Sequence, residues 1–281
     1  MRVTVCLLAL AGIASASPDA VNRAQELYHH TQYQNSIKVL AHDPAPDAAT
    51  YLLTGKNYFM LADYKKATEF FEKAIELTPN SSMAHLWLGR AWGRRAENST
   101  FMAISYAKKA HQAFEKAVAL DPHNDEAKND LFDYYLNAPG FLGGGIEKAE
   151  ALSRSIAAER PVEHEFEEAQ IAEKRNDLTR AESHFRKAIE LAPRDAGRIM
   201  DLARFLAKHK RFTESDQLFE RARKTQPDKA AVNFAEAKVA IDNHRNLDRA
   251  RTLLRTYLES QLTPDDPPRH EAEQLLKRAG G

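Results

Sequence analysis

The sequence predicts an all-α fold built from helix pairs that repeat along the chain. The stretch KKATEFFEKAIELTPN at residues 65–80 recurs in related form at residues 108–124 and 179–195. Within each copy, small and aromatic residues recur every three or four positions, which places them on one face of a helix. Each copy ends near a proline, and Pro193 and Pro227 lie 34 residues apart. A fixed period of this length is typical of repeat architectures.

The repeated segment is predicted to be the second helix of each pair. In the first copy Ala67 and Ala74 let a neighbouring helix approach closely, and Phe71 fills the gap between them. The later copies of this face are Ala110, Phe114 and Ala117; Ala181, Phe185 and Ala188; and Ser215, Phe219 and Ala222. The partner helices are predicted upstream, at residues 51–64, 85–95 and 199–212.

The predicted first helices carry the signature of a known family. The matching residues are Tyr51, Thr54, Gly55 and Tyr58 in one copy and Leu88, Gly89 and Trp92 in the next. In these positions the chain resembles the tetratricopeptide repeat family. The resemblance implies a right-handed α-α superhelical solenoid, in which stacked helix pairs share one continuous core. It also implies a protein that binds other proteins.

Four segments are expected along the chain. Residues 1–16 are predicted to be a signal peptide, and residues 17–47 a degenerate N-terminal repeat that acts as a cap. Residues 48–261 are predicted to hold about six repeats. After a run of prolines, residues 262–281 are predicted to form a closing helix.

The N-terminal segment is typical of an export signal. Arg2 precedes an apolar run at residues 3–13, and small residues follow at 14–16. We therefore expect a periplasmic or extracellular protein, the alternative being a cytosolic protein whose first helix is apolar. The apolar run is too short to span a bilayer, and no later one is longer. Cys6 is the only cysteine, so the exported chain would lack disulfides, thiolate metal sites and cysteine nucleophiles.

The composition favours a folded protein without a broad electrostatic preference. The chain is 43% hydrophobic, and its 40 basic residues balance 40 acidic ones. A neutral chain lacks the general attraction that binders of nucleic acids or of anionic membranes use, so neither partner is favoured and no nucleic-acid partner is expected.

Two insertions interrupt the 34-residue period. The first, near residues 93–102, is expected to lengthen two helices around a turn near Asn98. The second, at residues 137–145, contains Pro139 and a glycine run. One interpretation is an inter-helix turn with Phe141 and Leu142 packed on the core. The other is an anion site formed by the backbone amides of Gly143, Gly144 and Gly145.

No catalytic constellation is apparent, so we expect neither an enzyme, a cofactor nor a metal site. The histidines lack the spacing of a zinc protease, and the serines lack the context of a hydrolase nucleophile. An acidic run is expected to be a solvated first helical turn, because acids there favour the helix dipole. Its members are Glu163, Glu165, Glu167 and Glu168.

The predicted binding site is the concave groove, which the first helix of each pair lines in the family that the chain resembles. The residues expected to face it are Lys56, Phe59, Arg90, Arg94, Asp133, Gln170, Arg204 and Lys208. This row is basic at both ends and would suit an acidic or carboxylate-ended peptide. Leu52 and Lys56 stand where chaperone-binding members carry a lysine and asparagine pair, which argues against a chaperone-tail clamp.

We therefore expect a non-catalytic scaffold that holds a protein or an extended peptide in its groove. One alternative is an envelope assembly factor that docks its partner through the glycine loop. The other is a small-anion binder or enzyme that uses the same loop.

Overall fold

The computed structural model describes residues 18–226 and 230–280, and within them it contains fifteen α-helices, one short 3-10 helix and no strand. The all-α prediction is confirmed. The helices are α1 Pro18–His29, α2 Tyr33–Leu40, α3 Ala48–Met60, α4 Tyr64–Leu77, α5 Ser82–Glu97, α6 Ala103–Leu120, α7 Asp125–Asn137, η1 Gly140–Leu142, α8 Ile146–Ile156, α9 Pro161–Lys174, α10 Leu178–Leu191, α11 Ala196–Lys208, α12 Phe212–Thr225, α13 Ala231–Asp242, α14 Leu247–Glu259 and α15 Arg269–Arg278.

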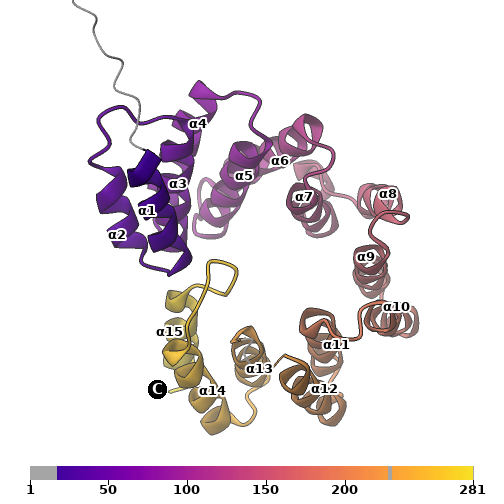
Figure 1. Cartoon of the computed structure of the whole chain (residues 1–281). Helices are drawn as coiled ribbons and strands as arrows, with labels where there is room; N and C mark the ends of the chain where they lie inside the picture. Colours follow the sequence, from indigo (N-terminus) through magenta and orange to yellow (C-terminus); the bar gives the residue numbers. More distant parts are fainter. Residues whose placement is uncertain (1–17, 227–229, 281) are drawn as a thin grey trace, which may run out of the picture.

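Consecutive helices form antiparallel pairs that stack into a right-handed α-α superhelical solenoid. Figure 1 shows the first helix of each pair, α3, α5, α7, α9, α11 and α13, on the inner side of the curve. The second helices lie on the outer side, and α15 follows the last pair. The curve is so tight that α15 returns beside the N-terminal helices (Figure 1). The chain therefore follows a nearly closed ring.

The predicted packing of small on aromatic residues occurs within the helix pairs. A side chain at Gly55 on α3 would begin 2.5 Å from the Phe71 ring of α4, and one at Gly89 would begin 2.6 Å from the Phe114 ring of α6. Such a contact is too short for any larger residue. The glycines of the family signature are therefore the places where aromatic rings of the second helices rest.

Five of the helix pairs turn through the same backbone motif. A residue in the left-handed conformation ends the first helix, and the next N–H donates to a carbonyl five residues back, as from Asp63 to Tyr58. This bond satisfies a carbonyl that the helix end would leave unpaired. The left-handed residues are Thr31, Ala62, Asn176, Lys210 and His244.

The two insertions occur in the pairs that lack this motif. The first lengthens α5 and α6, and the turn between them occupies residues 98–102. The second forms η1, which leads into a left-handed Gly143 with φ of 94°. A side chain at Gly143 would begin 2.3 Å from the His111 imidazole, and one at Gly144 would begin 1.9 Å from the Ala138 carbonyl oxygen. Close packing against α6 and α7 thus requires glycine at both positions.

Two further expectations concern the N-terminal segment and membrane-spanning helices. The predicted signal peptide at residues 1–16 and Cys6 lie outside the described residues. Among the described helices, none is long and apolar enough to cross a membrane.

Candidate functional site on the concave face

Most of the predicted groove residues line one of two hollows of the inner surface. The first, which we call the α5–α7 basin, has a volume of about 540 Å³ and is lined by Phe59, Arg90, Gly93, Arg94, Glu97, Phe114, Asp130, Asp133 and Tyr134. The second, the α11–α13 cavity, has a volume of about 490 Å³ and includes Arg204 and Lys208. Lys56 and Gln170 line neither hollow.

Arg90 of the basin and the nearby Lys56 already make contacts within the chain. Arg90 donates from Nε to Asp130 at 2.5 Å, and its Nη1 lies 2.9 Å from Glu126. The Arg90 guanidinium also lies over the Trp87 ring, 4.8 Å from its centroid, and Lys56 Nζ lies 5.0 Å from the same centroid. Burial lowers the pKa of Lys56. These contacts hold both cations against α5 and α7 and leave them less available to a partner than the sequence suggested.

Arg94 links the two ends of the solenoid. It donates to Tyr64 Oη at 3.2 Å, pairs with Glu97 at 3.1 Å and forms a further ion pair with Glu271 on α15. The residues of this last pair are 177 positions apart in the sequence. Arg94 therefore fastens the C-terminal helix to the second full repeat.

Asp133 lines the basin, and its pKa is raised. Part of the residue is exposed to solvent. Burial of its carboxyl group nevertheless raises the pKa of Asp133 to about 6, and the negative charges of Asp130, Glu163 and Asp201 add to the effect. Burial also raises the pKa of Asp130, against the opposing influence of Arg90. The acids of the basin therefore take up protons at a higher pH than isolated aspartates do, and Asp133 should titrate just below neutral pH.

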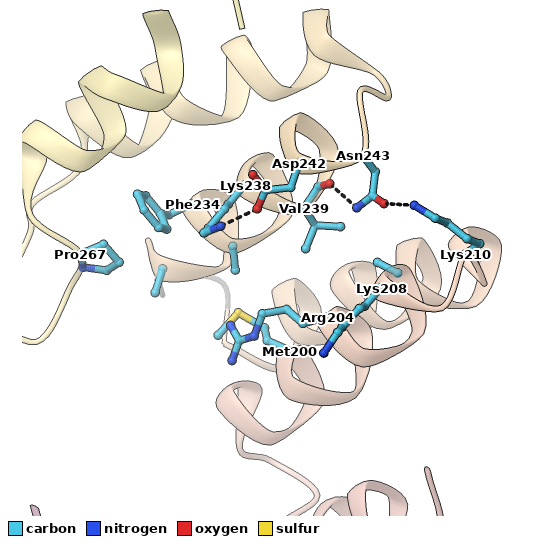
Figure 2. A pocket seen from close by; sticks show the side chains of 13 residues that line it. Met200, Arg204, Lys208, Lys210, Phe234, Lys238, Val239, Asp242, Asn243 and Pro267 are labelled. Atoms are coloured by element: carbon cyan, nitrogen blue, oxygen red, sulfur yellow. Dashed lines mark hydrogen bonds and ion pairs between the residues drawn. The ribbon is translucent and has the colours of Figure 1, made fainter. Parts of the chain in front are cut away.

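The α11–α13 cavity combines an apolar floor with a cationic rim. Met200, Ala207, Ala231, Phe234, Ala235 and Val239 supply its apolar side chains. Figure 2 shows Arg204 and Lys208 on one wall facing Lys238 and Asp242 across the opening. The lining contains four cations, namely Arg204, Lys208, Lys210 and Lys238, and one acid, Asp242. An apolar group that carries a negative charge would match both features.

The rim cations are more exposed than those of the basin. The side chains of Arg204, Lys208 and Lys238 are 47%, 69% and 51% exposed, against 23% for Arg90. Each has one acidic neighbour: Arg204 pairs with Asp201, Lys208 lies 2.9 Å from Glu173, and Lys238 pairs with Asp242. Asp201 and Glu173 are themselves largely buried, so only the pair between Lys238 and Asp242 is exposed on both sides and can exchange partners at little cost.

The acidic run of α9 was wrongly predicted to be solvated. Glu165, Glu167 and Glu168 are buried, because α9 packs between α8 and α10. Glu165 lies 2.6 Å from His184 and 2.5 Å from Lys187, whose hydrogen bonds hold its pKa below the usual value although burial opposes them. Glu168 pairs with Arg180 at 2.9 Å. Burial raises the pKa of Glu167 to about 8.

The glycine loop does not present an anion cradle. The N–H groups of Gly143, Gly144 and Gly145 donate to the carbonyls of Gly140, Pro139 and Tyr135, at 2.9, 3.3 and 2.8 Å. These amides are thus used inside the loop and are not directed at a ligand. Phe141, which was expected to pack on the core, is 71% exposed, because the short η1 turn directs it outward.

Within residues 18–226 and 230–280, no group of three or more histidine, cysteine, aspartate or glutamate side chains has the geometry to hold a metal ion. The side chains that do gather on the concave face are suited to non-covalent recognition.

The sequence reasoning missed Phe234 and Lys238, which form a wall of the α11–α13 cavity. The repeat period itself could have found one of them. Lys238 follows Arg204 by one period of 34 residues, and Asp242 follows Lys208 by the same interval. The groove row therefore continues one pair further than predicted.

Comparisons with known proteins agree with this architecture. Family models described as tetratricopeptide repeat match residues 172–239 and 48–81. A tetratricopeptide repeat protein from Parabacteroides merdae aligns with a TM-score of 0.61 at 14% identity, over 94% of this chain and 98% of that one. TTC0263, a thermophilic protein of the same type from Thermus thermophilus, aligns with a TM-score of 0.54 at 19% identity, over 67% of this chain and 97% of that one. No curated protein matches in sequence. Residues 48–81 and 172–239 therefore match tetratricopeptide repeats, and the described chain shares its solenoid fold with these two structures.

Proposed function

We propose that this chain is a non-catalytic scaffold that binds a protein through its concave face. Tetratricopeptide repeat solenoids generally serve as protein-interaction scaffolds, and the fold shown here is of that type. The single observation that carries the proposal is the α11–α13 cavity, where exposed cations surround an apolar floor. We infer that it accepts an apolar side chain of the partner while neighbouring carboxylates pair with the rim.

The proposal is tested with fluorescent peptides that hold a leucine or phenylalanine between acidic residues. We expect the full chain to bind these peptides and to bind their lysine-substituted counterparts far more weakly. The double variant Arg204→Glu with Lys238→Glu should weaken binding at least about tenfold, because two attractive contacts become repulsive. A matched control reverses Lys66 and Lys116, exposed cations of the second helices α4 and α6.

Two results would contradict the proposal. Equal binding by the groove variant and the wild type would remove the cavity from the site. Preference for the basic peptides would refute the charge match.

We also propose that the protein acts outside the cytoplasm, in the periplasm or the extracellular space. The support is the pattern of residues 1–16, with one cation, an apolar run and small residues. Fractionation of cells that express the chain with a C-terminal tag tests this. Recovery of an unprocessed chain in the cytoplasm would contradict it.

A further inference from the structure

The turn between α5 and α6 exposes an unusual group of apolar side chains. We call residues 98–109 the α5–α6 tip. Phe101 is 96% exposed, Ile104 56% and Met102 46%. The described residues contain seven exposed large apolar side chains, and the tip holds three of them. The exposed leucines at 77, 178 and 191 are instead single residues at helix ends.

The tip is an ordered projection. The Met102 N–H donates to Ser99 Oγ at 3.0 Å, and the Tyr106 N–H donates to the Met102 carbonyl at 2.9 Å. These bonds hold the turn in a form that directs Phe101 into solvent. Arg95 braces the base by donating to Thr68 at 2.7 Å and to Tyr106 at 3.0 Å. The exposed apolar surface is therefore fixed by its own hydrogen bonds.

The charge around the tip has one sign. From residue 98 to residue 114 the sequence contains no acid, although the chain as a whole is neutral. Lys108 and Lys109 are exposed in the second turn of α6. Lys108 follows Ile104 by four residues and so lies on the same helix face. Glu97, the nearest preceding acid, is paired with Arg94 at 3.1 Å.

The arrangement matches a segment that enters a lipid surface. The exposed Phe101, Met102 and Ile104 lie in the sequence between the hydroxyl residues Ser99 and Thr100 on one side and Ser105 on the other, and the exposed lysines follow one helical turn later. Interfacial segments order their groups in this way, with apolar side chains among the acyl chains and cations at the headgroups. A second copy would be repelled, since the two lysines of each tip would face each other.

The second insertion lies beside the same part of the molecule. Tyr134 Oη donates to the Leu142 carbonyl of η1 at 2.8 Å and also lies 3.1 Å from the Ala107 carbonyl oxygen of α6. This places the exposed Phe141 near the first half of α6. Both departures from the repeat period therefore add apolar surface at neighbouring places.

From these observations we propose that the α5–α6 tip docks the protein on an anionic lipid surface, with Phe101, Met102 and Ile104 entering the bilayer interface. The contact needs no membrane-spanning helix. It is separate from the concave face, so a peptide can occupy the groove while the tip is bound.

The test is co-sedimentation with vesicles of phosphatidylcholine alone and with added phosphatidylglycerol. It is run on the full chain and on a chain that begins at Ser17, which retains every described helix and removes the apolar N-terminal run. We expect both chains to bind the anionic vesicles, more weakly at high salt. The double variant Phe101→Ser with Ile104→Ser should reduce binding of the shorter chain roughly tenfold or more, because two inserted side chains are lost.

The matched control is Leu77→Ser with Leu191→Ser, which changes two leucines that are also exposed, 55% and 48%. It should bind as the wild type does. The proposal is overturned if the shorter wild-type chain does not sediment with anionic vesicles, or if the tip variant and the control bind equally. Concentration-dependent dimerisation that the tip variant abolishes, without vesicle binding, would also overturn it. These outcomes leave the groove assay unaffected, so the two proposals fail separately.

Discussion

The α5–α7 basin and the α11–α13 cavity occupy equivalent positions on the concave face but use their charges differently. In the basin, Arg90 is held by two acids and a tryptophan ring. Its neighbour Asp133 has a pKa raised to about 6. In the cavity, burial would raise the pKa of Asp242, but hydrogen bonds from Lys238 and Arg278 lower it. In the basin the arginines are thus engaged in ion pairs within the chain, whereas in the cavity the side chains of the cations are more exposed.

The difference teaches that one repeated surface can serve two purposes. Ion pairs within the basin stabilise the fold and fasten α15, whereas the exposed cations of the cavity remain able to pair with a partner. We therefore expect substitutions around the basin to change stability and those around the cavity to change binding.

The largest expected effect comes from Glu167, the buried acid of α9 whose pKa is raised to about 8. A raised pKa means that the folded state binds the proton more tightly than the unfolded state does. The stability contributed by this group is complete below pH 4.5 and is lost as the pH rises to about 8. Glu167→Gln should remove this decline and stabilise the protein by on the order of 5 kcal/mol at high pH. Urea unfolding across this pH range measures it.

A neighbouring glutamate provides the opposite control. The pKa of Glu165 is lowered, so its contribution is present at neutral pH and is lost as the pH falls. Glu165→Gln should destabilise the protein at neutral pH, where Glu167→Gln has the reverse sign. Effects of the same sign in both variants would show that burial does not govern these acids as described.

A smaller effect separates the basin from the cavity directly. In the variant Asp130→Ala, the half-buried Arg90 keeps only one acidic partner, the exposed Glu126. We expect the free energy of unfolding to fall by about 1–2 kcal/mol. Asp242→Ala, whose side chain is 37% exposed, should change stability by less than about 0.5 kcal/mol. Denaturant unfolding of both variants gives the comparison. Equal costs would mean that the two hollows do not divide stability and binding between them.

A modest energetic effect, but a visible change of shape, is expected at the ion pair between Arg94 and Glu271. Both side chains are about one-third exposed, so the pair contributes at most about 1 kcal/mol. Arg94→Glu should separate α15 from α5 and increase the radius of gyration in small-angle scattering. Adding Glu271→Arg should restore the wild-type value. An unchanged radius in the single variant would show that other contacts hold the ends together.

Local patterns in the sequence predicted the fold well, because the packing between paired helices depends on residues that belong to the same repeat. Gly55 and Phe71 illustrate this, since the small residue and the ring that covers it belong to one repeat. The burial of Glu165 and Glu168 was not predicted because it depends on helices on both sides of α9. Their cationic partners, Lys187 and Arg180, come from the following helix.

The candidate site was predicted only in part, for a related reason. The residues that face the groove follow from the repeat, and that rule reached Arg204 and Lys208. Which of them remain available depends on pairs between different repeats. The partner of Arg94 lies on α15, at a distance in the sequence that no periodic rule covers. Phe141 was misplaced because the prediction of an inter-helix turn does not fix the direction of its side chains, which here depends on the short 3-10 helix η1.

The return of α15 to α5 also bears on the order of folding. Most helix contacts in the described chain join neighbours in sequence, so pairs can form early and add to one another along the array. The contact between Arg94 and Glu271 closes a loop of 177 residues and cannot form before the intervening repeats have acquired their curvature. We therefore expect this contact to appear last in refolding and to open first, at a free energy below that of global unfolding.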